Sequence, residues 1–306
     1  MGKGGELPPR QRTSASGRDA RLAGVDARLY EDAAANVPAA PYYKALNDKV
    51  DKIVASSGGA KRADTELAHV VAGDGALVYP NRYLWAVPLY LCVALYLISR
   101  APSLLAVVLG LVPTYLCYDV YSGVTHVNLD DSRNLKGLKS YLLFQGCLEF
   151  QWHHAIPPDI TMKPFVAVCA DLNVMVLVNV AINVGLLGYT TGAPAMLTGL
   201  KLFGAYFGQL CHRSAHTPKH KRPAAFQALM DAGIMCPQHK HLNHHKAPHD
   251  KNFCLVGYCD VLINAMLRVC GTNDWLWFAI WITWTTTDVF VVSKLLAYAA
   301  PSVFAV

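Results

Sequence analysis

Histidine is the residue type in this chain whose spacing best indicates chemistry. Ten of the twelve histidines lie between Gln151 and His249, and nine of those ten form three tight clusters. The clusters are the pair in QWHH, the two histidines of HRSAH, and the group in HKHLNHH together with the histidine at 249. Neutral imidazole is the commonest side-chain ligand of iron, copper, nickel and zinc. The clusters therefore predict a metal centre.

The spacing within the clusters favours more than one metal ion. His212 and His216 are four residues apart, so on a helix they lie on one face and can hold one ion. His241 and His245 repeat this spacing, and His244 adds a third imidazole. A mononuclear zinc site uses three or four protein ligands, whereas eight candidates suit two ions with positions left for oxygen. The eight are His126, His153, His154, His212, His216, His241, His244 and His245. We assign His69 and His220 to solvent, and leave out His239 because it is out of phase with His241 and His245.

Three carboxylates are candidates to support these histidines. A metal-bound imidazole usually donates its other N–H to a carboxylate or a carbonyl. Asp119 precedes His126, and Asp231 lies in the segment that leads to the last cluster. Glu149 lies close to His153 and could be a ligand or a hydrogen-bond partner of one. Simple solvation at a membrane interface remains an equal alternative for the two aspartates.

Composition indicates a membrane protein. The 306 residues are 53% hydrophobic and only 16% charged, whereas soluble domains average about 25% charged residues. The basic residues behind the net charge of +6 are scattered without a nucleic-acid-binding motif, so we expect no nucleic-acid partner. The nine cysteines are dispersed and form no C-x-x-C pair, which argues against a disulfide framework or a cysteine-rich zinc module.

The hydropathy pattern predicts an all-α integral membrane fold. Residues 1–80 are polar and expected to be largely disordered, while residues 81–300 form the membrane-embedded domain. We expect about four main transmembrane helices, a possible fifth at the C-terminus, and an interfacial helix over 254–270. The apolar segments are 83–99, 102–118, 165–187, 193–210 and 275–299.

The predicted topology places the metal centre on one membrane face. The loops 120–164 and 211–253 fall on the same side as the N-terminal region, and they carry nearly all the histidines together with many Lys and Arg residues. Positive loops face the cytosol, or the stroma in a plastid. We therefore expect a histidine-rich metal cap on that face.

Motifs around the histidines are similar to those of the lipid desaturase family. The pattern runs D-x-x-S-G-x-x-H at 119–126, F-Q-x-H-H-x-x-P-x-x-I-T at 150–161, H-x-x-x-H at 212–216 and H-x-x-H-H at 241–245. This family includes plasmanylethanolamine desaturases and a plant plastid desaturase that acts on phosphatidylglycerol. The resemblance implies that the eight histidines bind two irons that activate O2.

The same resemblance implies an oxygen-dependent enzyme that introduces a double bond into a chain of an intact phospholipid. His249 resembles the plasmanylethanolamine branch, while Gln151 and Lys219 resemble the plastid branch. The start of the chain is not a convincing transit peptide, so we favour a plasmanyl chain in the endoplasmic reticulum over the palmitoyl chain of phosphatidylglycerol in a chloroplast. The chain lacks a G-x-G-x-x-G motif after a strand and any flavin or haem module. Electrons must then come from an external donor, a cytochrome-b5-type carrier in the first case and ferredoxin in the second.

Two other functions fit parts of the pattern. A lipid hydroxylase would share the histidine centre and differ only in its product. A non-enzymatic membrane metal-binding or transport protein would need polar residues along a path through the spans. The main polar residues within the spans are Asp171, Asn173, Asn179 and Asn183, all on the third segment. Asp171, Asn179 and Asn183 lie near one helical face, and we interpret them as lining a substrate tunnel or making helix contacts.

Overall fold

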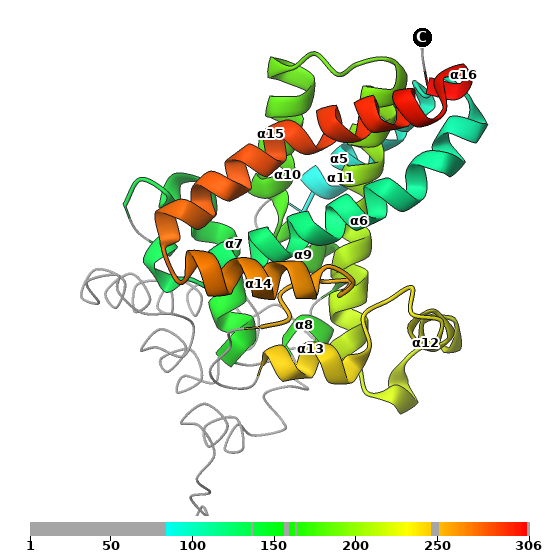
Figure 1. Cartoon of the computed structure of the whole chain (residues 1–306). Coiled ribbons are helices and arrows are strands. Elements are labelled where there is room, and N and C mark those ends of the chain that lie inside the picture. Colours follow the sequence, from blue (N-terminus) through cyan, green and yellow to red (C-terminus); the bar gives the residue numbers. More distant parts are fainter. Residues whose placement is uncertain (1–83, 136, 156–158, 163, 246–250, 305–306) are drawn as a thin grey trace, which may run out of the picture.

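The computed structural model describes residues 84–135, 137–155, 159–162, 164–245 and 251–304, and these are helical with no strand among them (Figure 1). The all-α prediction is therefore confirmed for the described residues. The predicted polar region 1–80 and His249 lie outside them. The shorter elements are η1 (Ser132–Leu135), α7 (Ser140–Ala155), α8 (Asp159–Met162), η3 (Lys219–Lys221), α12 (Ala224–Asp231), α13 (Gln238–His244), α14 (Asp260–Cys270) and α16 (Pro301–Phe304).

Helices α5 (Ala86–Ser99), α6 (Leu104–Leu129), α11 (Gly192–His216) and α15 (Asp274–Ala299) build the core. Helix α11 packs against α5, α6 and α15. Helix α6 begins after Ser103, whose Oγ accepts a hydrogen bond from the Ala106 amide at 3.0 Å, a standard N-terminal cap. On α11, Gly208 lets the ring of Tyr118 approach closely, because a Cβ there would lie 2.8 Å from Tyr118 Cζ.

The third predicted span is not one helix. Residues 165–187 divide into α9 (Phe165–Ala170), α10 (Asn173–Val180) and a π-helix, η2 (Ala181–Leu186). The prediction of a continuous span here is wrong, because α9 ends at Ala170 and α10 begins only at Asn173, after a turn at Asp171 and Leu172. Asn179 Nδ2 donates to Tyr121 Oη at 2.7 Å, and Asn183 Nδ2 donates to the Thr285 carbonyl at 3.4 Å. π-Helical turns of this kind are frequent near functional sites.

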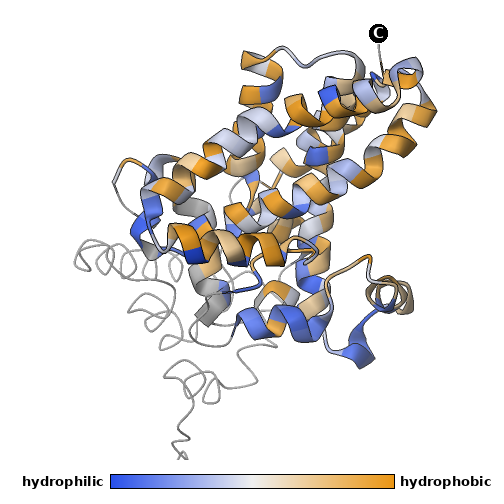
Figure 2. Cartoon of the chain, in the orientation of Figure 1, coloured by the Kyte–Doolittle hydropathy of each residue, from blue (hydrophilic) through white to orange (hydrophobic). Residues whose placement is uncertain are grey.

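Apolar surface covers much of the helical bundle. Among the described residues, α6 and α15 are long and apolar enough to cross a membrane, and α5 and the segment 173–186 are shorter apolar helices. The upper part of the bundle in Figure 2 is largely apolar, whereas α13 is hydrophilic. Helix α14 forms where an interfacial helix was predicted. Large apolar side chains are exposed on α5, α6, α14 and α15, among them Tyr96, Leu104, Val112, Val261, Val269, Leu295 and Tyr298.

Candidate metal centre

Four helices bring their C-terminal ends to one place. His126 lies in the last turn of α6, His153 lies two residues before the end of α7, His216 ends α11 and His244 ends α13. The carbonyl groups at a helix C-terminus carry partial negative charge, which favours a cation within the last turn. The four helix ends alone therefore favour a positive charge at this place.

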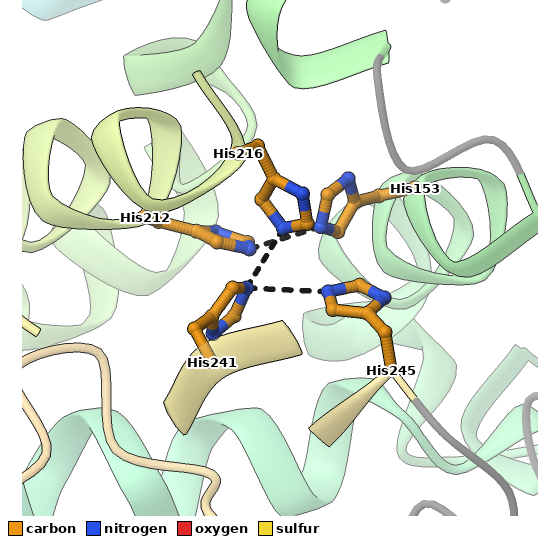
Figure 3. Close-up of side chains that lie close together, drawn as sticks. All are labelled: His153, His212, His216, His241 and His245. Carbon is orange, nitrogen blue, oxygen red and sulfur yellow. Dashed lines mark hydrogen bonds between the residues drawn. The ribbon is translucent and has the colours of Figure 1, made fainter. Parts of the chain in front are cut away.

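The first group consists of five imidazoles whose nitrogens lie within 4.8 Å of one another (Figure 3). Its members are His153, His212, His216, His241 and His245. The Nε2 atoms of His212 and His153 are 2.9 Å apart, and those of His241 and His216 are 2.8 Å apart. His245 Nε2 lies 3.2 Å from His241 Nε2. The rings come from α7, α11 and the α13 region, and they point toward a common centre.

The second group consists of His126, His244 and Asp130, all buried. His244 Nε2 lies 3.1 Å from one carboxylate oxygen of Asp130, and His126 Nε2 lies 3.6 Å from the other. The opposite ring nitrogens bond to backbone: His126 Nδ1 lies 2.8 Å from the Phe253 carbonyl and His244 Nδ1 lies 3.0 Å from the Lys251 carbonyl.

These hydrogen bonds assign the tautomers of the second group. A carbonyl can only accept, so each Nδ1 must carry the proton, and in a neutral ring Nε2 then presents a lone pair. Both lone pairs face the Asp130 carboxylate, which is itself an acceptor. A cation between them removes this repulsion, and the imidazole N–H to carbonyl bond is the usual support of a metal ligand. The residues present therefore fit a metal ion.

The two groups are neighbours. The ring centroids of His244 and His245 are 5.4 Å apart, those of His241 and His244 are 5.9 Å apart, and those of His126 and His212 are 6.0 Å apart. Seven imidazoles and one carboxylate exceed the ligand number of a single ion but suit two adjacent ions. The arrangement is compatible with a metal site.

The structure brings together seven of the eight histidines chosen from the sequence. The eighth, His154, lies in α7, and its side chain falls outside the described part of the structure. His220, which was assigned to solvent, is exposed, and so is His239, which was left out of the ligand set. His69 lies outside the described residues.

The three carboxylates chosen from the sequence lie in different settings. Asp119 bonds to backbone amides of the segment after Lys251, and exposed Asp231 accepts a hydrogen bond from Gln227 at 2.7 Å. Glu149 is buried and lines a small cavity together with His153. The carboxylate that sequence reasoning missed is Asp130, although its place four residues after His126 on a helix was a usable signal.

Buried cysteine near the site is poorly suited to bind a metal. Burial raises the pKa of the Cys236 thiol to about 12, with the nearby Asp260 carboxylate acting in the same direction. A metal binds the thiolate, so a thiol that remains protonated at neutral pH is a poor ligand. The donor set of imidazole nitrogen and carboxylate oxygen is typical of iron, copper or zinc rather than of an iron–sulfur cluster.

An apolar cavity opens beside the second group. It lies between α6, α10 and α11. His126 and Phe150 line it, together with apolar side chains such as Met175, Val176 and Leu202. A long apolar ligand in this cavity would therefore have one part beside His126.

Comparison with known proteins agrees with the motif resemblance. The model of the lipid desaturase domain matches residues 115–275, which are 161 of the 306 residues and include all eight candidate histidines. Fatty acid desaturase 4-like 1, chloroplastic, of Arabidopsis thaliana is 30% identical over 159 residues, covering 48% of this chain and 50% of that protein. Fatty acid desaturase 4, chloroplastic, of the same plant is 30% identical over 145 residues, covering 46% and 42%.

The chain thus spans about half the length of the curated relatives it matches. No solved structure matches it significantly. The family match covers more than half of the chain and contains both histidine groups and the residues that line the apolar cavity up to Leu255. This chain belongs to the lipid desaturase domain family.

Proposed function

We propose that this protein is a membrane-bound, di-iron desaturase that introduces a double bond into an acyl chain of an intact phospholipid. The observation that carries the proposal is the position of His126, which belongs to the second histidine group and also lines the apolar cavity. A hydrocarbon chain in the cavity would lie directly beside that group. Few functions other than oxidation of the chain need this combination.

Two irons account for the two groups of ligands. The first iron would be held by the five-imidazole group, and the second by His126, His244, Asp130 and, from the family resemblance, His154. When bound, the irons would use O2 to supply the oxidant that removes hydrogen from an unactivated C–H bond. Nitrogen and oxygen ligands resist this oxidant better than thiolates would.

The surrounding residues have three tasks. The carbonyls of Lys251 and Phe253 orient the rings of His244 and His126 through their Nδ1 protons. Phe150, whose ring meets that of His126 edge-on at 4.8 Å between centroids, shields the metal end of the cavity from water. The apolar cavity wall holds the chain, so that one C–H bond is presented repeatedly to the same position.

The protein would meet its substrate in the bilayer. The exposed apolar side chains of α5, α6 and α15 suit contact with lipid tails. The hydrophilic α13, seen in Figure 2, suits the headgroup region, so the histidine groups would lie near the membrane face. A phospholipid could then keep its headgroup in that region while its chain enters the cavity.

The relatives favour an acyl chain over the plasmanyl chain that we preferred from the sequence. Three curated relatives are named fatty acid desaturase 4 or 4-like, and each is described as chloroplastic. We therefore infer a plastid membrane rather than the endoplasmic reticulum, a metal site on the stromal side, and ferredoxin as the external electron donor. The palmitoyl chain of phosphatidylglycerol is the substrate to test first.

Lipid profiling tests the proposal. The full chain is expressed with a ferredoxin system in a host that lacks this activity, and phosphatidylglycerol is analysed for a new unsaturated chain. His245→Ala should abolish the product, whereas His220→Ala, a change at an exposed histidine outside both groups, should not. A hydroxylated chain would instead support the hydroxylase, and an acid-labile vinyl ether would restore the plasmanyl substrate. Purified protein with one zinc and no iron would refute the di-iron proposal.

A further inference from the structure

Two opposite charges are buried together between the long helices. Lys201 on α11 and Asp288 on α15 are 4% and 5% exposed, and Lys201 Nζ lies 2.6 Å from Asp288 Oδ2. Lys201 Nζ also lies 4.6 Å from the centroid of the Tyr121 ring, a cation–π contact. Charged groups among apolar helices are costly unless paired, and such pairs often have a functional role.

The ion pair stands between two cavities. The first is the apolar cavity beside His126, and Lys201 lines it too. The second is smaller and is lined by apolar residues such as Leu197 and Val292, together with Asp288. Lys201 and Tyr118 line both cavities, so these two side chains form the wall between them.

Lys201 lies one stretch of helix away from the metal ligands. It precedes His212 by eleven positions on α11, which corresponds to about 16 Å along a helix. Its Nζ atom reaches the ring of Tyr121, which precedes His126 by five positions on α6, or about 8 Å along a helix. The wall is also held rigidly at Tyr121, whose hydroxyl accepts hydrogen bonds from Asn179 at 2.7 Å and from Trp281 at 3.2 Å.

We propose that the Lys201–Asp288 ion pair closes the apolar cavity and sets the length of the hydrocarbon chain that the protein accepts. The inference rests on the proposed function, because it takes the occupant of the cavity to be a lipid chain. Each methylene group that enters the cavity moves from water or lipid to the apolar surface of the protein. This continues until the terminal methyl group contacts the ion pair. A longer chain would have to break the ionic contact, which is unfavourable in this buried position.

The test removes both charges and their bulk at once. Lys201→Ala/Asp288→Ala opens the wall at Lys201, keeps Tyr118 and leaves no uncompensated charge. Binding is measured with a series of phosphatidylglycerols of increasing acyl length, by thermal stabilisation of the purified protein. In the wild type, the affinity for phosphatidylglycerol should stop rising beyond a certain acyl-chain length. In the double variant it should continue to rise, about fourfold for each added methylene, which corresponds to about 0.8 kcal/mol.

Val292→Ala is the matched control. It enlarges the second cavity but leaves the wall intact, so the wild-type length limit should be unchanged. A double variant with the same limit as the wild type would overturn the inference. If the double variant does not accumulate, Ala205→Leu fills the first cavity ahead of the wall and must shorten the limit; an unchanged limit would again overturn it.

Activity separates this inference from the proposed function. The chain length of the desaturated product should shift in the double variant in the same direction as binding. A wild type that binds lipids with a length limit but forms no unsaturated product would contradict the desaturase proposal and leave the role of the ion pair standing. A wild type that desaturates chains without regard to length would contradict only the role of the ion pair.

Discussion

Asp119 connects helix α6 to the segment that orients the second histidine group. One carboxylate oxygen accepts hydrogen bonds from the amides of Val256 at 2.9 Å and Gly257 at 3.0 Å, and the other accepts from Cys259 at 2.8 Å. The neighbouring Ser122 Oγ accepts from the preceding amide of the segment at 3.0 Å. One turn of α6 therefore holds four amides of a segment with no regular structure of its own.

This segment also supplies the two carbonyls that orient His126 and His244. Phe253 and Lys251 lie only a few residues before the amides bound by Asp119. If the segment moves, both imidazoles lose the hydrogen bond that fixes their tautomer and their direction. The five rings of the first group are carried by α7, α11 and the α13 region, so they should be affected much less.

We predict that Asp119→Asn destabilises the protein and loosens the second metal position. The amide keeps one accepting oxygen for two of the backbone amides, but its NH2 group now faces the third donor. One hydrogen bond to a charged group is lost, worth about 1.5–3 kcal/mol, and a buried N–H is left unsatisfied at a cost of about 1–3 kcal/mol. The expected loss in free energy of unfolding is about 3–5 kcal/mol, within the sum of these two ranges.

The assay combines thermal unfolding of the purified protein with metal analysis. Asp119→Asn should unfold at a lower temperature and retain about one iron where the wild type retains about two, because the second group depends on the segment for its orientation. Asp231→Asn, at an exposed aspartate on α12, should change the free energy of unfolding by less than about 0.5 kcal/mol. An Asp119→Asn variant with wild-type stability and full metal content would refute the reasoning.

Three further predictions concern the metal centre and the ion pair. Asp130→Asn removes the charge that faces two imidazole nitrogens, so metal analysis should show loss of the second iron while the first remains. His245→Ala should weaken iron binding by at least roughly 10–100-fold in a chelator competition, the scale typical of a lost supporting contact, whereas His220→Ala should change nothing. Lys201→Met leaves a buried carboxylate uncompensated and should cost about 3–5 kcal/mol in chemical denaturation. Adding Asp288→Leu should restore most of that stability. If it does not, the loss in Lys201→Met does not come from an uncompensated Asp288 carboxylate.

The histidines could be chosen from sequence because their spacing is local. His212 and His216, like His241 and His245, are four residues apart, and one helical turn brings each pair together whatever the rest of the fold does. Asp130 was missed for a related reason. The apolar segment was taken to end at residue 118, whereas α6 continues to Leu129, and only this longer helix places Asp130 one turn beyond His126.

Hydropathy located the helices but not the break in the third segment. A run of apolar residues from 165 to 187 satisfies the length of a span, and the polar residues within it were interpreted as lining a tunnel or making helix contacts. The structure shows what they contact: Asn179 bonds to Tyr121 on α6 and Asn183 to Thr285 on α15. Such contacts join residues 58 and 102 positions apart, so a local pattern cannot reveal them.

Two charged residues lie inside segments predicted to span the membrane, which the sequence did not lead us to expect. From sequence, the third segment was taken to hold nearly all the polar residues of the spans, yet Lys201 and Asp288 lie on α11 and α15. Each charge alone would argue against a buried helix, because an unpaired charge in that position is costly. Only their pairing at 2.6 Å makes both tolerable. Lys201 of this pair also lines the cavity that His126 lines, so a hydrocarbon chain bound there would meet a charged group.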